Sequence, residues 1–109
     1  MACTVTVIGD EAWRPYDRVA LTSFFSDKDP EDLLLGDQDL WKRPGIRLHR
    51  NVPVTAIDRE AKSATALGRT VHYDSLVMAT GSYAFVPPVK GSDLPGSFVY
   101  RTVDDVAEL

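Results

Sequence analysis

Small and hydroxyl-bearing residues follow a short apolar run in the last third of the chain. Leu76–Ala79 shows no polar alternation, which is typical of a strand buried on both faces of a parallel sheet. Thr80, Gly81 and Ser82 then offer two hydroxyls and one residue that tolerates positive φ, so the backbone can turn sharply and approach a ligand at the strand's carboxyl end. The same residues are also typical of a plain strand-ending turn, and the motif by itself leaves both interpretations open.

An acidic pair follows the first β-branched run. Thr4–Ile8 predicts a strand, and Asp10 and Glu11 come directly after Gly9. In a dinucleotide-binding βαβ unit, a carboxylate after a parallel strand holds the adenosine ribose, and a Gly-rich phosphate loop lies about 20 residues upstream. Only ten residues precede Glu11 here. The sequence therefore predicts the ribose-binding half of that motif without the phosphate-binding half, with solvated turn carboxylates as the alternative.

Two arginines stand on either side of an aromatic residue in the next loop. Arg14 and Arg18 straddle Tyr16, and Pro15 fixes the backbone between them. Cations beside an aromatic ring suit a loop that faces a phosphate or a nucleotide. A surface arginine pair that balances the nearby acids is the alternative.

Metal and cysteine chemistry are not favoured. Cys3 is the only cysteine, which excludes an internal disulfide and disfavours a cysteine-based zinc site. His49 and His72 have no second ligand at metal spacing and are interpreted as ordinary strand histidines. The four carboxylates within residues 26–32 lack the calcium-loop pattern, so this stretch is expected to be a solvated loop.

The elements that must position these residues can be followed along the first half of the chain. Val19–Phe25 predicts a short helical segment with one apolar side. Asp37 is expected to cap a brief helix through Trp41, which Pro44–Gly45 ends. Ile46–Arg50 alternates as a strand.

The second half predicts a small antiparallel sheet and a final helix. Residues 52–73 alternate in three short runs, separated by turns at 60–62 and 68–69, which indicates a three-stranded meander. Phe98–Tyr100 predicts a brief strand. Thr102 is a suitable N-cap with Asp105 three residues later, so a helix is expected to begin there.

Composition limits the protein class. The chain has 109 residues, 44% hydrophobic and 26% charged, which fits one small globular domain. A net charge of −4 with scattered basic residues argues against a nucleic-acid surface. No run is long enough to span a membrane and no signal peptide is recognised, so a cytoplasmic location is expected. The chain begins and ends inside supersecondary units, which suggests an excised piece of a larger protein.

Taken together, the ordered runs resemble the pyridine-nucleotide-disulfide-oxidoreductase-like flavoproteins. Within this superfamily the chain looks like the FAD domain of the NAD(P)H-dependent nitrite reductase large subunit, with the rubredoxin and ferredoxin reductases as second choice. The resemblance implies an α/β fold: a partial FAD/NAD(P)-binding Rossmann-like sheet over residues 1–109, with the meander inserted and the first βαβ unit missing. The runs that carry it are Val7–Glu11, Arg14–Ser23, Gly45–Leu48, Ala56–Glu60, Tyr73–Ser82 and Pro87–Thr102.

The resemblance also implies which residues touch the cofactor. Glu11 matches the acidic residue that holds the FAD adenosine ribose, and Val54 the residue whose backbone meets the adenine edge. Ser23 stands where ferredoxin reductases carry a lysine near the flavin, which fits nitrite reductase better. The remaining matches are Arg14 and Arg18, along the adenosine and pyrophosphate, and Ala79, Thr80 and Gly81, at the strand end beside the cofactor.

The mechanism implied by the resemblance is hydride transfer from NAD(P)H to FAD, then single-electron transfer to an iron–sulfur cluster and sirohaem that reduce nitrite to ammonium. Ligands of those centres and the NAD(P)H loop are expected outside this chain, so no catalytic side chain is assigned. The chain alone is expected to be inactive, to bind FAD weakly if at all, and to self-associate through an unpaired sheet edge. The alternatives are a ferredoxin or rubredoxin reductase, or a non-enzymatic flavodomain that acts in assembly.

Overall fold

A computed structural model describes residues 3–26, 29–36 and 38–109 of the chain. These residues form two compact units, each built from two stretches of sequence. The first unit comprises Met1–Pro15 and Leu35–Met78, and the second comprises Tyr16–Leu34 and Ala79–Leu109.

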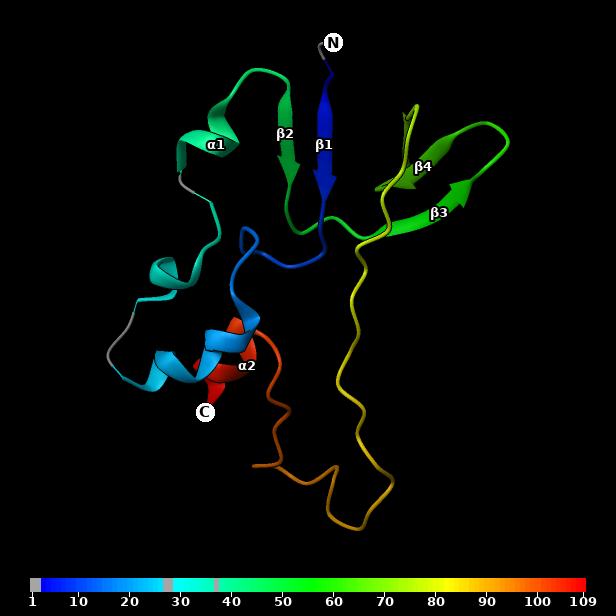
Figure 1. The fold of residues 1–109 in the computed structure, drawn as a ribbon. Helices are drawn as coiled ribbons and strands as arrows, with labels where there is room; N and C mark the ends of the chain where they lie inside the picture. Colours follow the sequence, from blue (N-terminus) through cyan, green and yellow to red (C-terminus); the bar gives the residue numbers. More distant parts are fainter. Residues whose placement is uncertain (1–2, 27–28, 37) are drawn as a thin grey trace. The chain divides into compact units, whose positions relative to one another are not determined.

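A parallel pair of strands forms the centre of the first unit. Strand β1 (Val5–Ile8) pairs with β2 (Ile46–His49) over their whole length, and the two run side by side in the same direction (Figure 1). The short helix α1 (Gln38–Lys42) precedes β2, and the turn at Pro44–Gly45 follows it. The predicted strands and the predicted brief helix are thus confirmed, whereas the cap proposed at Asp37 lies outside the described residues.

The antiparallel meander is also in the first unit. Strands β3 (Val54–Asp58), β4 (Ser63–Ala66) and β5 (Arg69–His72) follow one another in the order β3-β4-β5, as predicted. Alternate side chains of the middle strand would face opposite sides, yet Ser63, Ala64 and Ala66 are all buried. Small residues allow this strand to be covered on both faces. A register shift between Val54 and Ala56 places a bulge at the start of β3.

Short helices form the second unit. The 3₁₀ helices η1 (Arg18–Phe25) and η2 (Pro30–Leu33) lie in the first stretch of this unit, and α2 (Val103–Glu108) lies at the end of its second stretch. The core side chains of this unit are Tyr16, Leu21, Leu33, Val103 and Val106, all buried. The predicted helical segment at 19–25 and the predicted N-cap at Thr102 are therefore confirmed.

One predicted loop is partly wrong. Residues 26–32 were expected to be an irregular solvated loop, but η2 begins at Pro30. The side chain of Asp29 accepts a hydrogen bond from the backbone N–H of Glu31, and proline is favoured in a first helical turn because it lacks an N–H. The Asp-Pro-Glu sequence is thus a helix start. The carboxylates of this stretch had favoured the prediction of a solvated loop instead.

Two predicted strands are wrong. Leu76–Ala79 and Phe98–Tyr100 are extended but belong to no strand of the described residues. Instead of being buried, Val77 is 86% exposed and Met78 is 61% exposed. An apolar run becomes a strand only when a neighbouring strand accepts and donates its backbone hydrogen bonds, and the described residues supply none for these two runs.

Candidate functional site

The carboxyl ends of β1 and β2 meet at one edge of the parallel pair. Three backbone hydrogen bonds continue the pairing beyond the strands: Gly9 N to His49 O at 3.0 Å, Val52 N to Gly9 O at 2.9 Å, and Asn51 N to Glu11 O at 2.9 Å. These bonds fix the turn after β1 against the segment that leaves β2. Ligands of α/β sheets bind at this edge.

Three of the sequence-predicted site residues belong to the first unit and lie close to that edge in sequence. Glu11 is half-buried, and its carbonyl takes part in the bonding just described. Val54 begins β3 two residues after Val52 and is 41% exposed. Arg14, also half-buried, follows Glu11 in the same loop. The structure therefore brings the backbone around Glu11 next to the segment that leads into Val54.

Arg18 is held inside the second unit. Its Nη1 donates to the hydroxyl of Tyr16 at 2.8 Å and to the backbone carbonyl of Arg101 at 2.8 Å. The guanidinium carbon also lies 4.8 Å from the centre of the Tyr16 ring, in cation–π range. The predicted closeness of Arg18 and Tyr16 is thus confirmed, and this contact gives Arg18 a structural role.

The sharp turn predicted at residues 80–82 is wrong, because residues 76–89 form neither a turn nor a bend. Ala79, Thr80 and Gly81 are exposed, and Gly81 adopts a positive φ of 63°, which glycine tolerates. The Nε of Arg101 donates to the carbonyl of Ser82 at 2.8 Å. One side chain therefore fixes this segment, and the same residue's carbonyl accepts the bond from Arg18.

Arg101 is a residue that motif reasoning missed. Its backbone N–H also donates to the Asp105 carboxylate at 3.0 Å, within the capping box of α2. It joins the segment at 80–82, Arg18 and the start of α2. Its position directly before the predicted N-cap Thr102 could have identified it. The side chain at the third position of a capping box reaches back to backbone N–H groups at the cap, and here the Asp105 carboxylate also accepts from Arg101.

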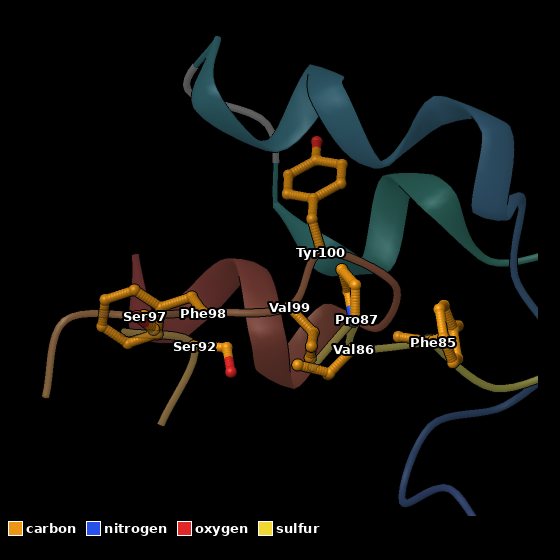
Figure 2. Close-up of a pocket in the computed structure, with 9 residues that line it drawn as sticks. Phe85, Val86, Pro87, Ser92, Ser97, Phe98, Val99 and Tyr100 are labelled. Atoms are coloured by element: carbon orange, nitrogen blue, oxygen red, sulfur yellow. The ribbon is translucent and has the colours of Figure 1, made fainter. Parts of the chain in front are cut away.

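A pocket of about 300 Å³, with Ser92 and Ser97 among its lining residues, lies in the second unit (Figure 2). Phe85, Val86 and Pro87 line it from one extended segment, and Phe98, Val99 and Tyr100 line it from another. No sequence-predicted site residue lines this pocket. Of the residues predicted to contact the cofactor, Glu11, Arg14 and Val54 belong to the first unit, and Arg18, Ala79, Thr80 and Gly81 belong to the second.

Neither a metal site nor a membrane segment is found in the part of the chain that the structure describes. No group of three or more His, Cys, Asp or Glu side chains there is placed to hold a metal ion. None of the helices formed by those residues has the length and apolar character needed to cross a bilayer.

Comparison with known proteins places the chain in a family. It is 45% identical over 106 residues to the large subunit of nitrite reductase [NAD(P)H] from Klebsiella oxytoca, and 43% identical over 103 residues to that of nitrite reductase (NADH) from Escherichia coli. These matches cover 96% and 94% of this chain but only 11% and 12% of the two relatives.

Solved structures agree with this result. A ferredoxin reductase from Rhodopseudomonas palustris superimposes with a TM-score of 0.86 at 28% identity, over 96% of this chain and 26% of that one. NADH:rubredoxin oxidoreductase from Clostridium acetobutylicum gives 0.85 at 27% identity, over 95% and 28%. The likeness confirms the predicted α/β fold class. The model of the pyridine nucleotide-disulphide oxidoreductase family matches residues 2–109, and the chain belongs to that family.

Proposed function

We propose that residues 1–109 are part of the FAD-binding domain of an NAD(P)H-dependent oxidoreductase, and that the whole protein is of the nitrite reductase large-subunit type. Members of the family are FAD-binding oxidoreductases that use pyridine nucleotides. The 45% and 43% identities to nitrite reductase large subunits favour that type. The observation that carries the proposal is the position of Glu11 at the carboxyl edge of the β1–β2 pair.

The chemistry of the residues at this edge fits the adenosine part of FAD. The carboxylate of Glu11 is an acceptor that can take two hydroxyl protons, which is what a ribose diol offers. Backbone groups at Val54 suit the edge of the adenine ring. Arg14 supplies a cation on the same loop for the pyrophosphate. In the second unit, Gly81 lets the backbone approach a ligand closely because no Cβ is present.

The roles of these residues are binding and orientation. Bound flavin supplies the redox chemistry, by accepting a hydride and passing single electrons on. Arg101 holds the segment at 80–82 through its bond to the Ser82 carbonyl, and this bond would keep that part of the proposed site in place. The iron–sulfur cluster and sirohaem of a nitrite reductase belong to other parts of such a protein, as does the NAD(P)H site. No catalytic side chain is proposed in this chain.

A ferredoxin or rubredoxin reductase is the second candidate, because both of the solved structures described above carry these activities in their names. The resemblance implies a lysine at the position of Ser23 in ferredoxin reductases, so the serine favours nitrite reductase. An assay of the complete gene product separates the two. NAD(P)H-dependent reduction of nitrite to ammonium supports the first proposal, whereas reduction of ferredoxin or rubredoxin without nitrite turnover supports the second.

We also propose that the chain forms homo-oligomers through its extended apolar run at Leu76–Met78. These residues are exposed and form no ladder with another strand of the described residues. Unpaired extended backbone with apolar side chains is a surface on which a second copy can add a strand.

Nucleotide binding tests the proposal directly. The 109-residue chain is titrated with AMP and with FAD, followed by amide chemical shifts and by flavin absorbance. We expect weak but saturable binding that shifts the amides of residues 9–11 and 51–54. Glu11→Gln should weaken the affinity about tenfold or more, because hydrogen bonds to a charged acceptor contribute about 1.5–3 kcal/mol.

Asp10→Asn is the matched control. Asp10 is the neighbouring carboxylate and is exposed, so its removal should leave the affinity within about twofold of the starting chain. Equal losses in both variants would contradict the assignment of Glu11. Shifts spread evenly over the chain, without an effect at the carboxyl edge, would contradict the site.

A further inference from the structure

Asn51 has an unusual backbone conformation for its place in the fold. In the described ranges, three non-glycine residues have positive φ: Asn51 at 59°, Lys62 at 50° and Leu67 at 51°. Lys62 and Leu67 lie in the two turns of the meander, where tight reversals favour this conformation. Asn51 is different because it lies between parallel strand β2 and the meander, at the carboxyl edge of the first unit.

The backbone of Asn51 is fixed beside the proposed ribose-binding residue. Its N–H donates to the carbonyl of Glu11 at 2.9 Å, and the next residue, Val52, donates to Gly9 at 2.9 Å. Two consecutive bonds to the turn after β1 set the position of this residue. Asn51 is therefore part of the same edge as Glu11, and three residues further on the chain reaches Val54.

The side chain of Asn51 is not used by the fold. The residue is exposed, and within the part of the chain that the structure describes its amide takes part in no hydrogen bond. An asparagine amide has a carbonyl acceptor and an NH₂ donor in one plane. That pair matches the donor and acceptor on the N6/N7 edge of adenine, which asparagine binds in a bidentate way.

We propose that Asn51 adds base specificity at this site by recognising the N6/N7 edge of the adenine ring, in addition to the backbone groups at Val54 and with Glu11 on the ribose. The inference rests on the proposed nucleotide site and adds the residue that selects its base. An inosine base replaces the N6 amine with a carbonyl, so it presents two acceptors to the amide and loses one hydrogen bond. The chain should therefore bind ADP more tightly than inosine diphosphate.

The test compares ADP, inosine diphosphate and 2′-deoxy-ADP in titrations of the full chain, followed by amide chemical shifts. We expect a preference of about tenfold for ADP over inosine diphosphate in the unchanged chain. Asn51→Gly should reduce that preference severalfold and leave only the part that the backbone groups at Val54 supply. Glycine accepts positive φ without strain, so this variant keeps the backbone and removes only the amide.

Two comparisons make the result specific. Leu67→Gly relieves the same backbone conformation in a meander turn, and it should keep the full preference for ADP. Glu11→Gln should weaken ADP and inosine diphosphate alike and leave their ratio unchanged. Such a loss with Glu11→Gln supports the nucleotide site independently of Asn51.

The overturning outcomes are distinct from one another. If Asn51→Gly retains the preference of the unchanged chain, Asn51 does not recognise the base, and the nucleotide site stands without it. If Asn51→Gly changes only the discrimination against 2′-deoxy-ADP, the residue acts on the ribose and the adenine assignment is wrong. Failure of the unchanged chain to bind any of the three nucleotides overturns both this inference and the proposed function.

Discussion

Arg101 shows how one residue can organise several short segments. Its Nε holds the Ser82 carbonyl, its own carbonyl accepts from Arg18, and its backbone N–H donates to Asp105. Positive φ at Gly81 could be predicted, because glycine between two hydroxyl residues is a local signal, but the sharp turn expected there is absent. The contact between Arg101 and Ser82 could not be predicted, because it joins residues that are 19 positions apart and no local pattern encodes it.

A substitution at Gly81 tests the positive φ of this residue. Gly81→Ala should lower the free energy of unfolding by about 1–2 kcal/mol, because an alanine at φ of 63° meets the left-handed penalty. An added Cβ would lie 3.9 Å from the Arg101 guanidinium, which is ordinary contact, so backbone strain alone sets the expected loss. Urea denaturation followed by circular dichroism measures it.

Gly9→Ala is the control for that measurement. Gly9 does not have positive φ, and an added Cβ there would meet no heavy atom within 4 Å. The free energy of unfolding of the Gly9→Ala variant should stay the same or rise slightly, since alanine restricts the conformations of the unfolded chain. A loss in Gly9→Ala as large as that in Gly81→Ala would show that the conformation of Gly81 is not the cause.

At the scale of the elements, features that depend on neighbouring residues could be predicted from the sequence. Features that depend on a distant segment could not. The capping box of α2 was predictable from Thr102 and Asp105, whose bonds are all within a few residues. The prediction of a strand at Leu76–Ala79 was wrong, because the apolar character of this run indicates only a preference for burial. Whether such a run becomes a strand depends on a partner strand, and the run itself carries no information about that partner.

Removal of the α2 cap is the prediction at this scale. Thr102→Ala should lower the free energy of unfolding by about 1 kcal/mol, because the N–H of Asp105 loses the acceptor that it now has at 3.1 Å. Thr102→Ser keeps a hydroxyl at the same position and should restore nearly all of that stability. Chemical denaturation of both variants decides the matter, and equal stability of the alanine and serine variants would refute a role for the cap.

At the scale of the whole molecule, much apolar surface is exposed. Val77, Met78, Tyr83 and Phe85 are each more than 60% exposed. Composition could not predict this exposure. A content of 44% hydrophobic residues is typical of a protein with an ordinary core, but it does not show which of those residues are buried. The family assignment, in contrast, was predictable, since it depends on the order of runs along almost the whole chain.

Self-association is the expected consequence of that surface. The sedimentation coefficient of the chain should rise with concentration, and Val77→Lys should shift the distribution towards monomer by placing a charge in the extended apolar run. Val19→Lys is the matched control, because Val19 is a valine that is 94% exposed but lies on η1. A chain that sediments as a monomer at all concentrations, or a Val19→Lys effect as large as that of Val77→Lys, would refute association through this run.

The meander also has a kinetic consequence. All of its pairings join residues close in sequence, and the carboxylate of Asp58 accepts from both Glu60 and Ala61 to close the first turn. In contrast, Val5 must find Ile46 before the parallel pair can form. Because short loops close with a small loss of entropy and hairpins form in about 1–10 μs, the meander is able to fold first and the parallel pair last. The edge that carries Glu11 and Asn51 is therefore completed late, when the most distant segments of the first unit have met.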